Sequence, residues 1–201
     1  MSPDSPQPRS RENTRARLLD AAAQVFAEVG LGGASVEAIV ERAGFTRGAF
    51  YSNFDSKDEL FLALAGAVAS ERIAHARTRI GELVDAPTLE DIGAFVLGSV
   101  DRPVDLMLTA EIRIRAMRDA EFGAAFAEQQ ERLIAEIAGI VTEATETRGL
   151  TLRVPADEAA RMLLAVWEAT SARGAILRLD EDQRKAECAR SIATLAALII
   201  G

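Results

Sequence analysis

The sequence feature that most constrains the fold is the stretch of residues 35–54, which reads SVEAIVERAGFTRGAFYSNF. Ser35 opens it, and its hydroxyl can cap the amino end of a helix. Four apolar residues then recur at helical spacing and share one face: Val36, Ile39, Val40 and Ala43. This half of the stretch therefore predicts a short helix that buries one face against its neighbours.

A turn and a second helix are predicted to follow. Gly44 can adopt the positive φ that ends a helix at little cost. Thr46 then stands where it can cap a second helix, which we expect over residues 47–53. Two short helices joined by a glycine turn form a helix-turn-helix, in which the second helix enters the major groove of DNA.

The second helix contains two residues that weaken it. Arg47 lies in the first turn, where the helix dipole disfavours a cation, and Gly48 costs about 1 kcal/mol relative to alanine. Both residues favour docking on DNA, because arginine can bind guanine or phosphate and glycine lets the backbone approach closely. A solvated loop would explain the same two residues, so it remains the alternative for them taken alone.

The next residues favour the DNA-binding interpretation. Phe50 and Phe54 are four apart and can anchor the second helix on its neighbours. Tyr51 and Asn53 lie off that anchor and can bind phosphate oxygens. The following segment, Ser-Lys-Asp-Glu from residue 56, fits a capping box that opens a long helix. Its free amides and the ammonium of Lys57 would form an anion site, with a solvated surface lysine as the alternative.

The segment AGFTRGAFYSNFDSKDELF resembles the DNA-binding core of the TetR family of transcriptional regulators, over roughly residues 11–64. The resemblance implies an all-α fold of nine helices, with a three-helix helix-turn-helix domain followed by a helical domain for ligand binding and dimerisation. Asn53 stands where many members have histidine, and Ser35 where threonine is common. By position, the residues that would face DNA are Ser35, Thr46, Arg47, Gly48, Tyr51, Asn53 and Lys57.

The resemblance also implies a function and partners. We expect a regulator, acting as a repressor, that binds a palindromic double-stranded operator as a dimer and is released by a small-molecule effector. The expected organisation is a disordered tail over residues 1–10, the helix-turn-helix domain over 11–56 and the helical domain over 57–201. The alternative is a helical ligand-binding or interaction protein whose helix-turn-helix no longer binds DNA.

Composition limits how DNA could be bound. The chain has 201 residues, of which 49% are hydrophobic and 5% aromatic, and this favours helices around a sizeable core. Its net charge of −8 is unlike that of a nonspecific nucleic-acid binder. Even the first sixty residues carry seven Lys and Arg against nine Asp and Glu. DNA binding must then depend on local cations, for which the candidates are Arg9, Arg11, Arg15, Arg17, Arg47 and Lys57.

Hydrophobic periodicity predicts the other helices. A first helix over residues 11–29 should end at Gly30 and bury one stripe: Leu18, Leu19, Ala22, Val25, Phe26 and Val29. A long helix should run from residue 56 or 57 to about 80. Five more are expected over 88–100, 103–117, 119–147, 155–179 and 181–200. The last two are rich in alanine, and the resemblance implies that they pair with their mates in a homodimer; closing the monomer core is the alternative.

An effector pocket is expected among the middle helices, and its apolar character points to a hydrophobic ligand. Large or flexible side chains are the candidates for its lining, with ordinary core packing as the alternative: Phe95, Met107, Phe126 and Trp167. Glu111 and Arg113 could supply polar contacts to the ligand.

The sequence offers little for catalysis. His75 and Cys188 are single residues far apart in the chain, and no glycine-rich phosphate loop or metal-ligand motif is present. We therefore expect no enzymatic activity, no cofactor and no metal. A single cysteine excludes an internal disulfide, the apolar runs are too short to cross a bilayer and the amino terminus lacks a signal core. We expect a cytoplasmic protein that does not enter membranes.

Overall fold

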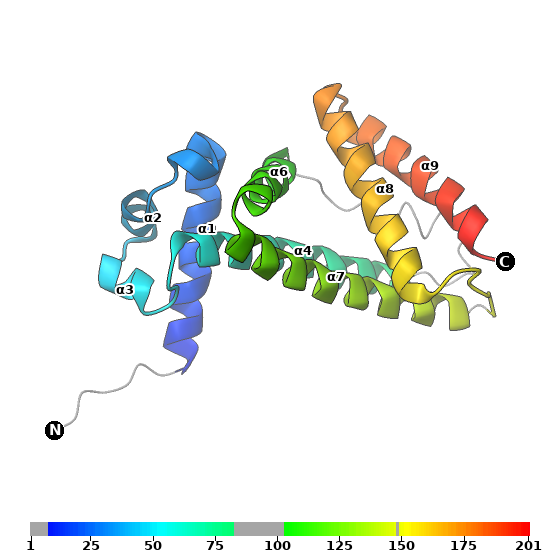
Figure 1. Cartoon of the computed structure of the whole chain (residues 1–201), viewed down its shortest axis with the longest axis horizontal. Coiled ribbons are helices and arrows are strands. Elements are labelled where there is room, and N and C mark those ends of the chain that lie inside the picture. Colours follow the sequence, from blue (N-terminus) through cyan, green and yellow to red (C-terminus); the bar gives the residue numbers. More distant parts are fainter. Residues whose placement is uncertain (1–7, 83–102, 148) are drawn as a thin grey trace. The chain divides into compact units, whose positions relative to one another are not determined.

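The computed structural model describes residues 8–82, 103–147 and 149–201, and these residues form eight helices (Figure 1). Their bounds are α1 (Pro8–Gly33), α2 (Val36–Ala43), α3 (Arg47–Tyr51), α4 (Lys57–Glu82), α6 (Pro103–Arg118), α7 (Ala120–Glu146), α8 (Ala156–Ile176) and α9 (Glu181–Ile199). Within these residues β-pairing is limited to one isolated bridge between Leu152 and Ile200. The all-α fold is therefore confirmed, while the helix expected over residues 88–100 lies outside the described residues.

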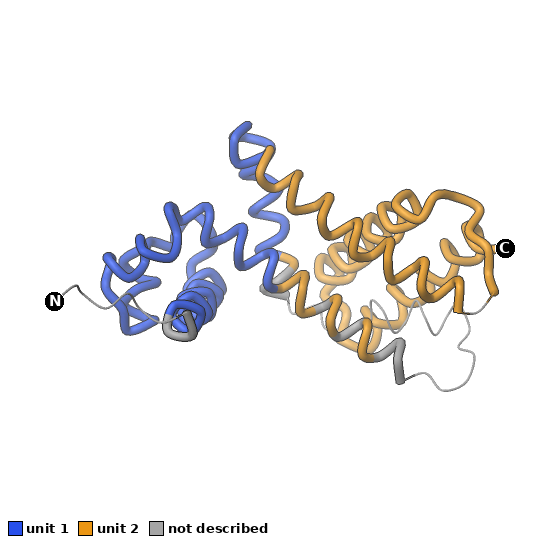
Figure 2. The backbone as a smooth tube through the Cα atoms, turned by 90° about the horizontal axis from the view of Figure 1, so that it is seen from below, with its two compact units in different colours: residues 1–67, 107–123 blue, residues 68–106, 124–201 orange. Residues whose placement is uncertain are grey.

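The chain divides into two compact units (Figure 2). The first unit comprises Met1–Ala67 and Met107–Gly123, and the second comprises Val68–Leu106 and Ala124–Gly201. The first unit extends past the predicted domain boundary at residue 56, and α4 and α6 both make polar contacts inside it. The assignment of DNA binding to one part of the chain and ligand binding to the other stays a prediction.

The core of the first unit is made by apolar faces of α1 to α4 and of α6. The largest fully buried side chains of this unit come from these helices and from the residues after α3: Leu18, Ile39, Phe50, Phe54, Leu60, Phe61 and Ile112. The rings of Phe26 and Phe61 meet edge to face, with centroids 6.4 Å apart. This packing places α3 on the surface of the unit with one side anchored.

Helix α1 buries most of the predicted stripe. Four of its members are buried in the core: Leu18, Ala22, Val25 and Phe26. Val29, predicted to continue the stripe, is instead 54% exposed. It immediately precedes Gly30, whose φ of 71° and ψ of 175° interrupt the regular helix.

The two ends of α1 differ from the prediction in instructive ways. The helix was expected to stop at Gly30, and the regular helix is indeed interrupted there, but a further helical turn carries it to Gly33. At the other end, residues 8–10 are helical although they were predicted to be part of the disordered tail. The rest of that tail lies outside the described residues.

The second unit contains the antiparallel pair α8 and α9, packed on each other. Trp167 of α8 is buried there in a cluster with Cys188 and Ile192 of α9. Arg161 of α8 also holds Glu131 of α7 in a two-pronged ion pair, with nitrogen–oxygen distances of 2.8 and 2.7 Å. Among the helices of the described ranges, none combines the length and the apolar character that crossing a bilayer requires.

The start of α7 passes very close to the end of α6 at Gly123. A Cβ placed at this position would lie 2.6 Å from the carbonyl oxygen of Ala116. We expect Gly123→Ala to lower the free energy of unfolding by about 1–3 kcal/mol, because backbone rather than a flexible side chain must move. Urea denaturation followed by circular dichroism measures the change.

Gly139 provides the matched control, since it lies in the same helix and no atom is within 4 Å of the Cβ it would gain. Gly139→Ala is expected to raise the free energy of unfolding by about 0.5–1 kcal/mol, because alanine is the better helix former. Equal losses in the two variants would show that the contact with Ala116 is not what Gly123 provides.

Candidate nucleic-acid interface

Helices α2 and α3 both begin at residues whose side chains cap them. The hydroxyl of Ser35 accepts a hydrogen bond from the Ala38 amide at 3.1 Å, and that of Thr46 accepts one from the Ala49 amide at 3.2 Å. Both capping residues are exposed, so they combine this local role with access to a partner. Gly44, between the helices, has φ 69° and ψ 34°, the left-handed conformation that the sequence predicts.

Helix α3 has one buried and one exposed face. Phe50 is fully buried and Phe54, just beyond the helix, is 1% exposed, with their ring centroids 5.8 Å apart. The predicted aromatic anchor is therefore present. Tyr51 packs edge to face on Phe50 but remains 49% exposed, so its hydroxyl end reaches the surface.

Gly48 also lies on the exposed face of α3. A Cβ added to it would meet one atom, the Thr46 hydroxyl oxygen, at the ordinary contact distance of 3.7 Å. Internal packing in the described structure therefore leaves room for a larger residue, although glycine weakens the helix. A glycine here would let an external partner approach the backbone closely.

Arg47 forms an exposed ion pair across the two helices. Its guanidinium lies 2.8 Å from the carboxylate of Glu37 in the first turn of α2, and the side chains are 62% and 60% exposed. A hydrogen bond to the Tyr51 hydroxyl and then the charge of Glu37 raise the pKa of Arg47. Arg47 is therefore a permanent cation held between an anion and a phenol at the surface.

Three arginines of α1 have a structural role that their sequence positions do not reveal. Arg11 and Arg15 donate to the carbonyl oxygens of Ser52 and Asn53, at 3.0 and 2.8 Å, and so cap the carboxyl end of α3. Cations at this position favour a helix because they face its negative end. These two arginines, proposed above as cations for DNA, hold α3 in place instead of lying free for it.

Arg17 does the same for α2. Its guanidinium donates to the Ala43 carbonyl at 2.8 Å and lies 4.6 Å from the centre of the Phe45 ring. The side chain of Arg9, the fourth candidate of this group, lies outside the described residues. Spacing along the chain could not reveal these contacts, because each donor lies 26 to 41 residues from its acceptor.

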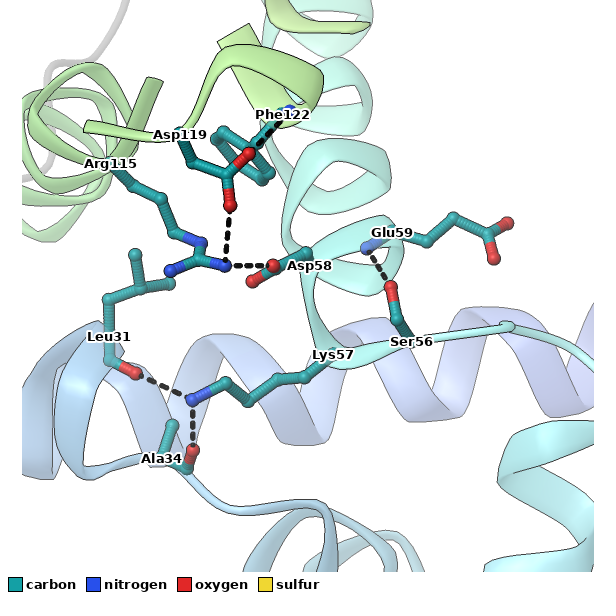
Figure 3. A network of polar contacts seen from close by, with 9 residues as sticks. All are labelled: Leu31, Ala34, Ser56, Lys57, Asp58, Glu59, Arg115, Asp119 and Phe122. Atoms are coloured by element: carbon teal, nitrogen blue, oxygen red, sulfur yellow. Dashed lines mark hydrogen bonds and ion pairs between the residues drawn. The ribbon is translucent and has the colours of Figure 1, made fainter. Parts of the chain in front are cut away.

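Lys57 points into the protein (Figure 3). Its ammonium donates to the carbonyl oxygens of Leu31 and Ala34, at 3.3 and 3.0 Å, and lies 5.8 Å from the centre of the Phe61 ring. The cation thus completes the carboxyl end of α1, where carbonyls lack helical partners. This orientation corrects the expectation that the ammonium forms part of an open anion site.

The predicted capping box before α4 is present in a modified form. Ser56 accepts a hydrogen bond from the Glu59 amide at 3.1 Å, as expected (Figure 3). The Glu59 carboxylate, however, accepts from the amide of Asp55 at 2.6 Å instead of from that of Ser56. Two amides near the start of α4 therefore already donate to side chains. Fewer amides are left to bind a phosphate than the sequence suggests.

Helix α6 supplies further contacts that hold the first unit together. The Glu111 carboxylate accepts a hydrogen bond from the Leu31 amide at 2.7 Å, directly after the kink in α1. Arg115 pairs with Asp58 at the start of α4 and with Asp119 (Figure 3). Glu111 was predicted to contact a ligand, and the structure instead gives it this role within the first unit.

Asn53 is turned toward its own helix. Its side-chain nitrogen donates to the Ala49 carbonyl at 2.8 Å, and its side-chain oxygen is buried without a hydrogen-bond partner among the described residues. The phosphate contact predicted for Asn53 would require this amide to leave the Ala49 carbonyl. Of the residues predicted to face DNA, Arg47, Gly48 and Tyr51 therefore form the exposed group on α3.

All six described cations between residues 11 and 64 have a partner within the chain. Four donate to backbone carbonyls, as described above: Arg11, Arg15, Arg17 and Lys57. Both terminal guanidinium nitrogens of Arg42 donate to the carboxylate of Glu28, at 2.9 and 2.7 Å, and this hydrogen bonding lowers the pKa of Glu28. Arg47 pairs with Glu37, so DNA would have to displace a partner to bind any of the six.

The predicted pocket residues do not gather in one place. Phe95 lies outside the described residues, and Met107 is 57% exposed on the part of α6 that belongs to the first unit. Trp167 is packed in the α8–α9 cluster, which is the core role left open as the alternative. Phe126 is half-buried on α7. Nor does the described part of the chain group three or more metal-binding side chains.

Comparison with known proteins relates this geometry to a family. The family model described as "Bacterial regulatory proteins, tetR family" matches residues 18–64, which include α2, α3 and the start of α4. Over this segment the chain is similar to the TetR family. The resemblance seen in the sequence is thereby confirmed, and the match covers the helix-turn-helix and its anchors.

Curated TetR-family relatives match beyond this segment. The HTH-type transcriptional repressor AcnR of Corynebacterium efficiens is 33% identical over 118 residues, which are 59% of this chain and 58% of AcnR. The HTH-type transcriptional repressor Rv1474c of Mycobacterium tuberculosis is 29% identical over 143 residues, covering 71% of this chain and 72% of that protein. The chain thus aligns with little more than half of AcnR.

Solved structures of transcriptional regulators share the fold along nearly the whole chain. A protein described as a TetR-family regulator from Mesorhizobium loti has a TM-score of 0.73 at 22% identity, covering 95% of this chain and 98% of its own. FadR from Bacillus subtilis, solved in complex with stearoyl-CoA, has a TM-score of 0.65 at 20% identity and covers 92% and 98%. These structures confirm the fold.

Proposed function

We propose that this protein is a sequence-specific DNA-binding transcriptional regulator, acting as a repressor, that binds a palindromic operator as a homodimer. The observation that carries the proposal is the two-sided α3: Phe50 is fully buried, while Arg47 and Tyr51 stand exposed on the opposite side. A helix whose residues served stability alone would bury its aromatic residues and would avoid an arginine and a glycine in its first turn. The curated repressors that match this chain support the same function.

The dimer would place two copies of α3 in successive major grooves, with a spacing near one turn of DNA, roughly 34–36 Å. Faces of α8 and α9 support the predicted dimerisation through these helices. Part of their alanine content is buried in the unit, as at Ala159, Ala160 and Ala196. The remainder includes an exposed row of alanines on α8 at helical spacing: Ala165, Ala169 and Ala172. Small side chains in such a row permit the close approach of a second pair of helices.

We further propose that a small hydrophobic molecule regulates this binding through the second unit. The support is the family fold, in which FadR binds stearoyl-CoA. A ligand would release DNA only if it prefers a conformation whose two α3 helices no longer fit successive grooves. Helix α4 connects the two units covalently, because it begins in the first and continues into the second.

Selection of bound genomic fragments, followed by sequencing, tests the proposal. The expected result is enrichment of one palindromic motif, with half-sites about 10 bp apart, and a gel shift by a species that sedimentation shows to be a dimer. Failure to enrich or retard any duplex would refute the regulator and favour the helical ligand-binding alternative. An active monomer would refute the dimer alone.

Replacing Arg47 gives a residue-level prediction. We expect Arg47→Ala to weaken operator binding by about 1–3 kcal/mol and to relax base preference at one position of each half-site, because arginine can bind guanine through two hydrogen bonds. Fluorescence anisotropy on the selected duplex and on its single-base variants measures this. Equal weakening on every duplex would mean that Arg47 contacts only phosphate.

Arg132→Ala is the control for this measurement. Arg132 is an exposed arginine of α7 in a pair with Glu128 at 2.8 Å, and its side chain is 62% exposed, as is that of Arg47. Its removal changes the net charge equally but leaves α3 intact. Operator affinity should therefore stay near that of the unmodified protein.

A further inference from the structure

We propose that Glu37 is a specificity-determining residue, which suppresses binding of Arg47 to DNA phosphates and so reserves this cation for base edges. The inference rests on the proposed function, because it concerns how DNA is chosen. Its basis is the ion pair between Glu37 of α2 and Arg47 of α3, with a nitrogen–oxygen distance of 2.8 Å.

The position of Glu37 makes it a competitor for phosphate. It lies in the first turn of α2, the first helix of the helix-turn-helix, and that helix crosses the DNA backbone when the second enters the groove. A phosphate that replaced Glu37 as the partner of Arg47 would leave two anions side by side. Repulsion between them makes such a complex weaker on any sequence.

Base edges avoid this penalty. The guanine O6 and N7 acceptors that arginine binds carry no formal charge. Arg47 can therefore turn to a guanine while Glu37 remains nearby, with only the exposed ion pair lost, and such pairs contribute little. Tyr51 contacts the guanidinium from its own helix and limits the directions in which Arg47 can turn. The arrangement penalises nonspecific contacts more than specific ones, which is how discrimination between partners increases.

The other cations increase the importance of this pair. Arg11, Arg15, Arg17 and Lys57 are committed to helix-end carbonyls. Sequence-independent affinity for DNA comes mainly from cations that neutralise phosphates. Arg47 is the described cation on the exposed face of α3, so a carboxylate placed on it controls much of the affinity for unrelated DNA.

The test compares specific and unrelated DNA directly. The probes are a duplex selected by the unmodified protein from 40-bp duplexes with a randomised centre, and a shuffled duplex of the same composition. Affinities are measured by fluorescence anisotropy at several salt concentrations for Glu37→Gln, which removes the charge and retains the shape. We expect affinity for the shuffled duplex to rise roughly 5- to 30-fold, in line with one removed anion near a phosphate.

Affinity for the selected duplex should change less than about 3-fold, because the contact made there is with a base. On the shuffled duplex, the slope of log affinity against log salt concentration should steepen by about 0.9, the value for one additional phosphate contact. A double-mutant cycle tests whether Glu37 acts through Arg47. In an Arg47→Gln background, Glu37→Gln should no longer raise affinity for the shuffled duplex appreciably, because no guanidinium is left for it to free.

Glu41→Gln is the matched control. Glu41 is an exposed glutamate of the same helix, and its substitution removes the same charge near the other end of α2. It should change the affinities for the two duplexes equally and by a small factor. A melting temperature unchanged in all variants shows that they remain folded, as expected for exposed side chains.

Two failures are distinguishable. If the unmodified protein selects and binds a duplex but Glu37→Gln strengthens both duplexes equally, or strengthens neither, the role of Glu37 is refuted and the regulator stands. A gain that persists in the Arg47→Gln background likewise refutes it. If the unmodified protein selects no sequence at all, the proposed function itself fails, and the inference fails with it.

Discussion

Phe50→Ala is expected to lower the free energy of unfolding of the first unit by about 3–5 kcal/mol, the cost of removing a fully buried phenylalanine from a packed core. Phe50 is 0% exposed and touches the rings of Tyr51 and Phe54. Its loss should free α3 first, because this helix has only five residues and a single buried anchor of its own. Hydrogen exchange at the α2 and α3 amides, together with urea denaturation, measures the change.

Tyr51→Ala separates the anchor from the exposed face. Tyr51 is the neighbouring aromatic residue but is 49% exposed, so its removal should cost less than half as much stability. We expect Phe50→Ala to lose DNA binding through loss of α3, and Tyr51→Ala to weaken it while α3 remains protected from exchange. Similar losses of protection in the two variants would contradict the anchor role of Phe50.

Lys57→Met is expected to lower the free energy of unfolding by about 2–3 kcal/mol, because it removes a cation that donates to two carbonyls at the end of α1. Methionine retains the apolar stem beside Phe61. The ammonium faces these carbonyls and not DNA. The slope of log affinity for DNA against log salt concentration should therefore change by less than about 0.9, the value expected for a lost phosphate contact. Urea denaturation and anisotropy at several salt concentrations measure the two effects.

The opposite pattern would restore the phosphate role that sequence position suggests for Lys57. In that case stability would be unchanged and the salt dependence would fall by about one unit. Lys185→Met serves as the control, because Lys185 forms an exposed pair with Glu181 one turn away in α9. Such pairs contribute about 0.3–0.5 kcal/mol, so stability should be nearly unaffected.

Local signals explain what the sequence predicted well. The caps at Ser35 and Thr46, the glycine turn at Gly44 and the pair Phe50 and Phe54 all depend on residues within four positions of each other. Helix caps, turns and i, i+4 pairs depend on residues that are close in the sequence, so the local sequence pattern predicts them. The helix-turn-helix was therefore predictable in some detail.

Long-range contacts explain what the sequence did not predict. Arg15 and Lys57 were assigned to DNA because a cation near a DNA-binding helix suggests phosphate. Which acceptor a long side chain reaches depends on tertiary packing, and both reach carbonyls at helix ends. The ion pair between Glu37 and Arg47 likewise depends on the angle between two helices, which no spacing rule provides.

The lining of the proposed effector pocket is the part that the sequence predicts least. Met107 and Trp167 are candidates for the pocket because their side chains are large or flexible. These properties do not distinguish a residue that lines a pocket from one on the surface or in the core. Met107 lies on the surface and Trp167 lies in the α8–α9 cluster. Pocket shape arises from small differences in helix packing, so single residues carry little information about it.

The chain passes through the first unit twice, leaving after Ala67 and returning from Met107 to Gly123. Grafting the first unit onto a different protein by a single cut near residue 67 would therefore be insufficient. Such a chimera would lack Glu111 and Arg115, and with them the acceptor for the Leu31 amide and the partner of Asp58. A transplantable module must carry the returning helix as well, which makes this a two-segment part for protein engineers.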